Sequence, residues 1–173
     1  MHPALGIVVV LGVLVVLLAG LRLWQQRRAP HSETVRKMLH IVMGGVAVVL
    51  PWIFTSPLPV VVLCSLATGM MLAIRLVPGL RRLAGNVVCG VERESWGDVY
   101  FPMVVGVIFV AARGEKLLYV VPVLTLALAD ATAALIGLRY GAHRYRATEG
   151  RKSAEGSLGF FVVAAVSVFV PLM

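Results

Sequence analysis

The chain has 173 residues, of which 60% are hydrophobic and only 14% are charged, and its mean hydropathy is +0.93. This composition excludes an ordinary soluble domain and is typical of a membrane protein. The net charge of +8 does not indicate nucleic-acid binding, because the basic residues stand mainly at the ends of apolar runs instead of forming one stripe. We therefore predict an all-α, polytopic transmembrane protein that forms a single integral membrane domain over residues 1–173.

About six apolar runs follow one another along the chain, and each is interpreted as a membrane segment because a spanning helix needs about 20 apolar residues. The predicted segments are residues 4–23, residues 38–54, a third between a proline-rich turn at 55–59 and residue 74, residues 99–112, residues 117–138, and a last one that starts near residue 158. The fourth is short for a full span, so it either begins earlier or lies partly re-entrant. The last is marginally short and has no polar flank before Met173, which leaves truncation at the C-terminus open.

Lysine and arginine alternate between the loops that join these segments. The first, third and fifth loops hold five, four and five of them, whereas the second and fourth hold none and two. By the positive-inside rule we expect the odd loops in the cytoplasm and the N-terminus outside. The sequence thus predicts an integral protein of the cell (inner) membrane whose polar loops all face the cytoplasm.

The first candidate functional block stands at the entry to the second segment. On a helix Arg36 and His40 are four residues apart and Lys37 adjoins them, so one face near the membrane surface presents cationic and proton-carrying groups. A capped helix start with basic anchors explains the same residues about as well. The presence of His40 favours a functional site over a simple helix start, since anchoring a helix at the membrane surface needs no histidine.

The second block, ERESWGDVYFP, precedes the fourth segment and contains Arg93 and Asp98. Asp98 fits equally well as an N-cap, whose carboxylate satisfies free helix N–H groups. Alternatively, a carboxylate at a membrane boundary holds a metal ion or accepts a proton from an alcohol. Both interpretations stay open on the sequence alone.

The third block begins with Asp130 inside the fifth apolar segment. Ala133, Gly137 and Gly141 follow at spacings of three and four, which is typical of closely packed membrane helices. Such packing explains the small residues but gives Asp130 no role. Because placing an acidic side chain in a membrane helix costs free energy, we interpret Asp130 as a functional residue.

A basic loop then leads to a fourth block, residues 152–157. Lys152 supplies a mobile positive charge, and the small residues after it supply backbone N–H groups that no side chain obstructs, as a phosphate requires. The glycine-lysine adjacency and preceding strand of a P-loop are absent, so that motif is rejected. Together with Asp130, this block predicts a metal-nucleotide site at the membrane surface.

These four blocks, in this order, resemble the CTP-dependent lipid kinases, a family that includes dolichol kinase, phytol kinase and the CTP-using diacylglycerol kinase and is related to phosphatidate cytidylyltransferase. The matching pieces are residues 33–37 with His40, residues 93–102, Asp130 and Ala131 with Gly137 and Gly141, and residues 152–157. The resemblance implies an enzyme that moves the γ-phosphoryl group of CTP to a lipid alcohol.

On this interpretation the expected cofactor is Mg²⁺, held by Asp130 with Asp98, since magnesium is usually bound by one or two carboxylates plus phosphate oxygens. Asp98 or His40 would take the proton of the alcohol, and the choice between them stays open. The residues expected to bind CTP are Arg36, Lys37, Arg93, Lys152, Ser153, Glu155, Gly156 and Ser157.

Two other functions remain as alternatives. A cytidylyltransferase would use the same nucleotide but make a CDP-lipid from a lipid phosphate. A non-enzymatic transporter or scaffold is disfavoured, because a transporter carries polar or broken helix centres along a path, whereas polarity here gathers at one membrane face. The acceptor stays open among polyprenols such as dolichol, phytol-like alcohols and diacylglycerol, and so does the oligomeric state.

Overall fold

The computed structural model of the chain describes residues 2–28, 32–80, 96–147 and 150–173. In its first half it forms α1 (Pro3–Arg28), α2 (Ser32–Val48), α3 (Leu50–Ile53) and α4 (Pro57–Leu76). The second half forms α6 (Gly97–Ala111), α7 (Lys116–Leu124), the π-helical segment η1 (Thr125–Ala129), α8 (Asp130–Tyr140), the antiparallel strands β1 (Arg144–Ala147) and β2 (Gly150–Ser153), and α9 (Ala154–Leu172).

Five helical stretches in the described ranges are long and apolar enough to cross a membrane. They are Pro3–Arg28, Thr34–Ile53, Pro57–Leu76, Lys116–Tyr140 and Ala154–Leu172. Helix α6 is apolar but has only 15 residues, which gives a rise of about 22 Å against a hydrocarbon thickness of about 30 Å. The prediction of an all-α, polytopic membrane protein is therefore confirmed, and its fourth segment is indeed the short one.

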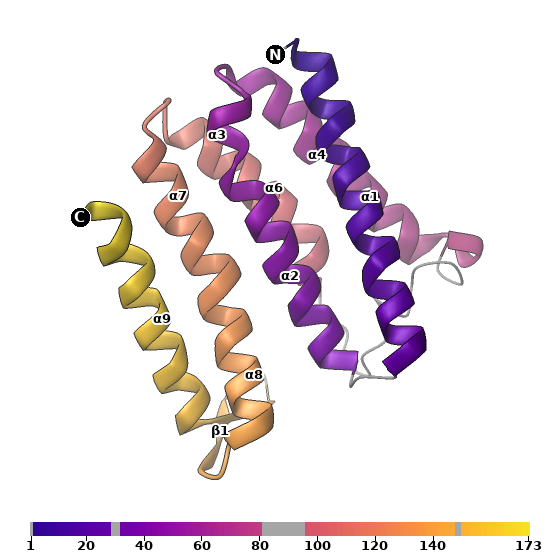
Figure 1. The fold of residues 1–173 in the computed structure, drawn as a ribbon. Coiled ribbons are helices and arrows are strands. Elements are labelled where there is room, and N and C mark those ends of the chain that lie inside the picture. The colour runs from indigo at the N-terminus through magenta and orange to yellow at the C-terminus, as the bar shows by residue number, and fades with distance from the viewer. Residues whose placement is uncertain (1, 29–31, 81–95, 148–149) are drawn as a thin grey trace.

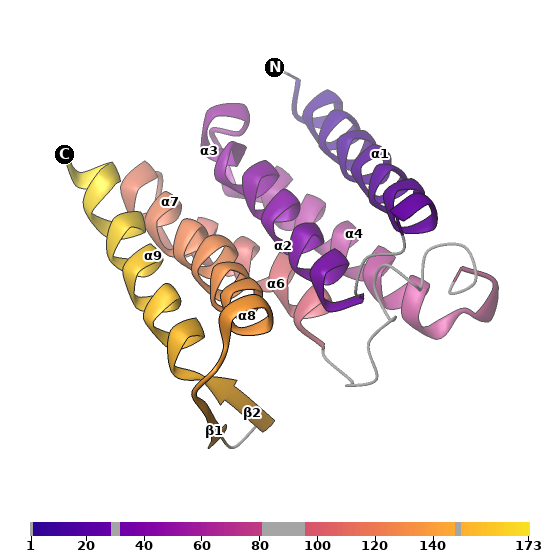
Figure 2. The ribbon, with the colours of Figure 1, turned by 60° about the horizontal axis from the view of Figure 1, so that its bottom comes forward.

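Successive long helices run in alternating directions, as Figure 1 shows. The C-terminal end of α1, the start of α2 and the β1–β2 hairpin lie toward one end of the bundle, and both chain termini lie at helix ends that point away from the hairpin (Figures 1 and 2). The first and fifth connections are thus on one side, as the alternating charges predict. That this side is the cytoplasm stays a prediction.

Packing within the bundle relies on two close helix pairs, α4 with α6 and α8 with α9. In the second pair a Cβ added to Gly156 of α9 would lie 2.7 Å from the carbonyl oxygen of Ala133 and 3.4 Å from the Cα of Gly137, both on α8. Only glycine allows backbones to approach so closely. The predicted packing role of these small residues is therefore confirmed.

Fully buried side chains from α2, α4 and α7 fill the interior, among them Val35, Met71 and Tyr119. The Tyr119 hydroxyl donates a hydrogen bond of 2.8 Å to the carbonyl oxygen of Ala47, so its burial leaves the hydroxyl satisfied. Large apolar side chains such as Phe161 are exposed on the outside. An apolar exterior is what a surface in contact with lipid requires.

The structure corrects two predicted boundaries and adds a hairpin. Helix α2 begins at Ser32, and α9 begins at Ala154 rather than near residue 158. The second correction has a clear cause, because the Ser153 side chain accepts a hydrogen bond of 3.1 Å from the Gly156 N–H. This N-cap starts the helix before the apolar run does. The hairpin occupies a stretch that the sequence indicated only as a basic loop.

Candidate functional site

Titratable side chains from three helices gather toward the end of the bundle that carries the hairpin. Lys37 and His40 come from α2, Asp98 from α6 and Asp130 from α8. The charge of Arg36 on α2 acts on both Asp98 and His40. Residues from two separate sequence blocks thus lie within electrostatic reach of the N-terminal part of α2.

The closest contact in this group joins α2 to α8. The Lys37 Nζ donates to Asp130 Oδ2 at 2.5 Å. The lysine side chain is only 10% exposed, whereas the aspartate side chain is 54% exposed. Asp130, which we predicted as a functional acid within an apolar segment, thus has Lys37 as a partner that neutralises its charge. The contact fixes one carboxylate oxygen and leaves the carboxyl group open on its other side.

A π-helical turn stands directly before Asp130. In η1 each turn contains one extra residue, and such π-bulges occur frequently at functional sites. Ala127 of η1 lies so close to α2 that a Cβ added to Gly44 would overlap the Ala127 Cβ. The absence of a side chain at Gly44 therefore lets α2 approach the turn that presents Asp130.

His40 lies on the same face of α2 as Lys37 and Gly44, at spacings of three and four. Its ring packs against Phe101 of α6, with the ring centroids 4.5 Å apart and the planes at 64°. The charges of Asp130 and Lys37 both act on it. His40 therefore contacts the Phe101 ring and lies within electrostatic reach of Lys37 and Asp130.

Asp98 is held differently, inside the first turn of α6. Its side chain is 5% exposed, and its Oδ1 is 4.0 Å from the Arg75 Nη1 of α4. The Arg75 guanidinium stacks over the Trp96 ring at 4.2 Å from the centroid. Neither carboxylate oxygen has a hydrogen-bond partner among the residues that the structure describes, which leaves out 81–95. No side-chain cap bond is formed at the start of α6.

The metal prediction can be compared with these positions. Among the described residues no three histidine, cysteine or acidic side chains gather into a metal-binding group. Magnesium does not require such a group, because one or two carboxylates and the phosphates of a nucleotide are its usual ligands. The open side of Asp130 fits this pattern. Asp98 already has the Arg75 guanidinium as a nearby cation, and its oxygens accept no hydrogen bond from the described residues. The residues present are thus compatible with Mg²⁺ bound together with a nucleotide.

The fourth block, by contrast, is largely engaged in local structure. Glu155 accepts from the backbone N–H of His143 at 3.1 Å and contacts its Nδ1 at 2.7 Å. Ser157 shares a 2.7 Å hydrogen bond with Tyr145 of β1 and donates to the carbonyl oxygen of Ser153. With the capping bond to Gly156, these contacts fix the hairpin to the first turn of α9.

Two other residues predicted to bind CTP stand apart from these contacts. Lys152 lies opposite Tyr145 in the hairpin and is exposed, and within the described ranges its side chain forms no hydrogen bond or ion pair. Arg93 lies outside the residues that the structure describes. No direct contact places Lys152 on the Lys37–Asp130 pair, so the fourth block and that pair are separate parts of the candidate site.

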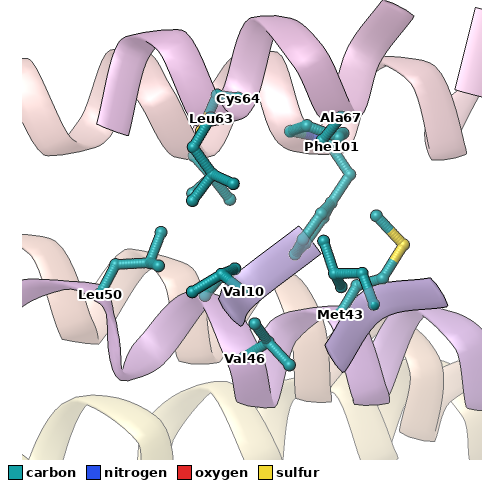
Figure 3. A pocket seen from close by; sticks show the side chains of 12 residues that line it. Val10, Met43, Val46, Leu50, Leu63, Cys64, Ala67 and Phe101 are labelled. Carbon is teal, nitrogen blue, oxygen red and sulfur yellow. The ribbon is translucent and has the colours of Figure 1, made fainter. Parts of the chain in front are cut away.

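An apolar cavity of about 40 Å³, which we did not predict from the sequence, lies between α1, α2, α4 and α6. Figure 3 shows its side chains pointing toward one another from these helices, with Met43 and Phe101 on facing sides. All of its lining residues are apolar or cysteine. Phe101 was part of the second sequence block, but only its contact with His40 and its place in the cavity wall suggest a role for it.

Comparison with known proteins bears on the family. The chain is similar to the protein named phytol kinase from Synechocystis sp. (strain ATCC 27184 / PCC 6803 / Kazusa), with 29% identity over 129 residues, which are 73% of this chain and 53% of the relative. The chain thus spans about half the length of that relative. No family model matches the chain, and neither does any solved structure. The similarity confirms the resemblance to the lipid kinases that was drawn from the four blocks.

Proposed function

We propose that this chain carries the catalytic part of a kinase that transfers the γ-phosphoryl group of CTP to a lipid alcohol. The observation on which the proposal rests is the Lys37–Asp130 pair, which joins two of the four family-like blocks across α2 and α8. The similarity to a protein named phytol kinase supports a lipid alcohol as the acceptor. The choice of CTP rests on the resemblance of the four blocks to CTP-dependent lipid kinases.

Asp130 and Lys37 would bind the phosphates of the nucleotide. A bound Mg²⁺ would neutralise negative charge on the phosphates and hold them in line for transfer. Asp130 would hold the ion through its exposed side, while Lys37 keeps the carboxylate in position and adds a positive charge close to the transferred group. Arg36 and Arg75 contribute further positive charge near Asp98.

His40 would take the proton of the alcohol. As the alcohol O–H bond breaks, the proton passes to a ring nitrogen of His40, the alcohol oxygen bonds to the γ-phosphorus, and the bond from that phosphorus to the bridging oxygen breaks. CDP leaves with the electron pair. His40 lies one helical turn from Lys37 on α2, within electrostatic reach of Asp130, which favours it over Asp98, whose carboxylate instead faces Arg75.

The hairpin and the start of α9 would supply further positive charge for binding the phosphates. Lys152 is exposed, so its ammonium group is free to move toward incoming phosphates. Ser153, Glu155, Gly156 and Ser157 would act by holding this hairpin on α9, because their side chains or N–H groups already bond within it.

The active end would face the cytoplasm of the cell (inner) membrane, as the positive charge of the odd loops predicts. Single cysteines at Arg28 and Ser56, in a chain without Cys64 and Cys89, test this with a membrane-impermeant thiol reagent. In intact cells only the cysteine at Ser56 should react, and the one at Arg28 should react after lysis. Reaction of the Arg28 position in intact cells would reverse the orientation.

Two labelled nucleotides separate the kinase from a cytidylyltransferase. The full chain, inserted in vesicles with Mg²⁺, should transfer label from γ-labelled CTP to phytol or a polyprenol and none from α-labelled CTP. The Asp130→Asn variant serves as the inactive control, and ATP and GTP as competing donors test the nucleotide. Transfer of α-label to a lipid phosphate would overturn the kinase proposal.

A further inference from the structure

We propose that the apolar cavity between α1, α2, α4 and α6 binds the hydrocarbon chain of the lipid acceptor, in the part next to its hydroxyl group. This inference rests on the proposed function, because it names where the acceptor of that reaction lies. It goes further by assigning a binding site to a cavity that none of the predicted catalytic residues lines, and by limiting the class of acceptor.

Phe101 connects the cavity to the catalytic group. Its ring contacts His40 at a centroid distance of 4.5 Å, and the same side chain forms part of the cavity wall. Met43, one helical turn beyond His40 on α2, lines the cavity beside it. A chain lying in the cavity would therefore place a terminal hydroxyl close to the proposed proton acceptor.

The cavity extends from this point into the hydrophobic interior. Its lining residues on α2 and α3 run from Met43 to Leu50, a rise of about 10 Å at 1.5 Å per residue. On α1 it is lined by Val10 and Leu14, which lie in the middle of a membrane-spanning helix. Its long direction thus leads away from the charged end, as the chain of a membrane lipid would.

Its lining suits hydrocarbon better than water. A volume of about 40 Å³ exceeds the roughly 10–15 Å³ that one water molecule needs, but a water also needs two to four polar partners. The side chains here are valine, leucine, methionine, alanine, cysteine, phenylalanine and proline. Apolar cavities stay dry, and one of about 150 Å³ binds benzene. Because this cavity is smaller, a lipid chain would displace some of the side chains that line it.

The apolar lining also distinguishes among the three classes of acceptor alcohol that the sequence analysis left open. In diacylglycerol two ester groups lie next to the hydroxyl, and the cavity offers their oxygens no hydrogen-bond donor stronger than the Cys64 thiol. Burying such polar groups without partners costs free energy. A single-chain alcohol, with hydrocarbon directly after the hydroxyl carbon, meets no such penalty. We therefore expect phytol-like and polyprenyl alcohols to bind in preference to diacylglycerol.

Ala67 on α4 is the position that tests this assignment, because it is 4% exposed and its small side chain leaves the cavity open. The Ala67→Leu substitution would fill the space, and Ala67→Val would fill part of it. Ala111→Leu is the matched control, since Ala111 is exposed at the end of α6 and is no part of the cavity wall.

The experiment uses a prenyl alcohol that carries a photoreactive diazirine near its hydroxyl group, added to the full chain in phosphatidylcholine vesicles. After illumination, mass spectrometry should find the probe on cavity residues of α2 and α4. Unlabelled phytol should compete and dioleoylglycerol should compete at least tenfold less well. Labelling should fall about tenfold in Ala67→Leu, less in Ala67→Val, and not at all in Ala111→Leu.

Turnover adds a second measurement that separates this inference from the kinase proposal. In Ala67→Leu the KM for phytol should rise about tenfold while the KM for CTP stays unchanged. Labelling of the cavity without any transfer from CTP would refute the kinase and keep the binding site. Labelling confined to outward-facing residues, equal competition by dioleoylglycerol, or unchanged labelling in Ala67→Leu would overturn the binding site.

Discussion

Two ion pairs lie at the charged end of the bundle, and they differ in which side chain is the more exposed: the carboxylate in one pair and the cation in the other. In the Lys37–Asp130 pair the nitrogen and oxygen are 2.5 Å apart, and the carboxylate is the exposed member at 54%. In the Arg75–Asp98 pair the atoms are 4.0 Å apart, and the carboxylate is only 5% exposed. The first pair joins α2 to α8, and the second joins α4 to α6.

This difference assigns the two carboxylates different tasks. A carboxylate that is fixed on one side and open on the other is ready to bind a ligand from outside the protein. A buried carboxylate beside cations instead holds those cations in place, since an unpaired buried charge is costly. The comparison therefore predicts that Asp130 acts in turnover and that Asp98 acts mainly through the arginines near it.

Asp130→Asn should have the largest effect. The amide keeps the shape of the side chain but removes the charge that would hold a divalent ion, so kcat should fall at least about 100-fold, as when one electrostatic contact to a reacting group is lost. Initial rates with γ-labelled CTP measure this. Glu115→Gln, at the opposite end of α7, is the control and should keep wild-type rates.

The coupling of the pair can be measured in the same assay. If Lys37 acts through Asp130, Lys37→Gln should lower the rate much less in the Asp130→Asn background than in the wild type, because residues in contact are not additive. Independent, additive losses would show that the ion pair does not act as a unit.

Gly44→Ala should break the Lys37–Asp130 pair without touching either residue. The added Cβ would overlap Ala127 and push α2 away from η1, and overpacking of this kind typically costs about 1–3 kcal/mol. We expect kcat to fall about tenfold. Gly45→Ala is the matched control, because a Cβ there meets nothing within 4 Å. The double variant Gly44→Ala/Ala127→Gly should regain activity, and failure to do so would refute the role of this contact.

Asp98→Asn should affect nucleotide binding more than turnover. The substitution removes the negative charge of Asp98 beside Arg75, and we expect the KM for CTP to rise about fivefold with kcat nearly unchanged. Stability should fall by about 1–3 kcal/mol, the usual cost of a lost partner for a buried charged group. Kinetics and thermal unfolding in detergent test both parts. A loss of kcat as large as that of Asp130→Asn would instead make Asp98 the proton acceptor or a metal ligand.

The helices could be predicted from the sequence because apolar length is a local property. The start of α9 was also readable in principle, since Ser153 before Ala154 and Glu155 is an N-cap signature. The hairpin was not, because strands with the sequences RYRA and GRKS carry charges where an alternating apolar pattern would be needed. The π-turn η1 has no known sequence pattern at all, although it determines how Asp130 faces α2.

The candidate site was predictable only as separate residues. Lys37 and Asp130 were each named as candidates, but they are 93 residues apart in sequence, so their contact depends on which helices become neighbours. The same holds for His40 with Phe101 and for the cavity, whose walls come from α1, α2, α3, α4 and α6. Spacing within one helix identifies a face, but not the helix that packs against it.

Trp96→Leu should give the smallest effect and would refine the description of the Arg75–Asp98 pair. The guanidinium of Arg75 stacks on the Trp96 ring, and a cation–π contact at an exposed site is worth about 0.5–1 kcal/mol. If this contact holds Arg75 near the nucleotide, its loss should raise the KM for CTP about two- to fivefold. Trp52→Leu is the control, because Trp52 makes a similar contact with Lys116 at 5.2 Å in the part of the bundle away from the charged cluster. An equal rise in both variants would mean that the aromatic residues act only through membrane anchoring, and that Arg75 is held by Asp98 without help from Trp96.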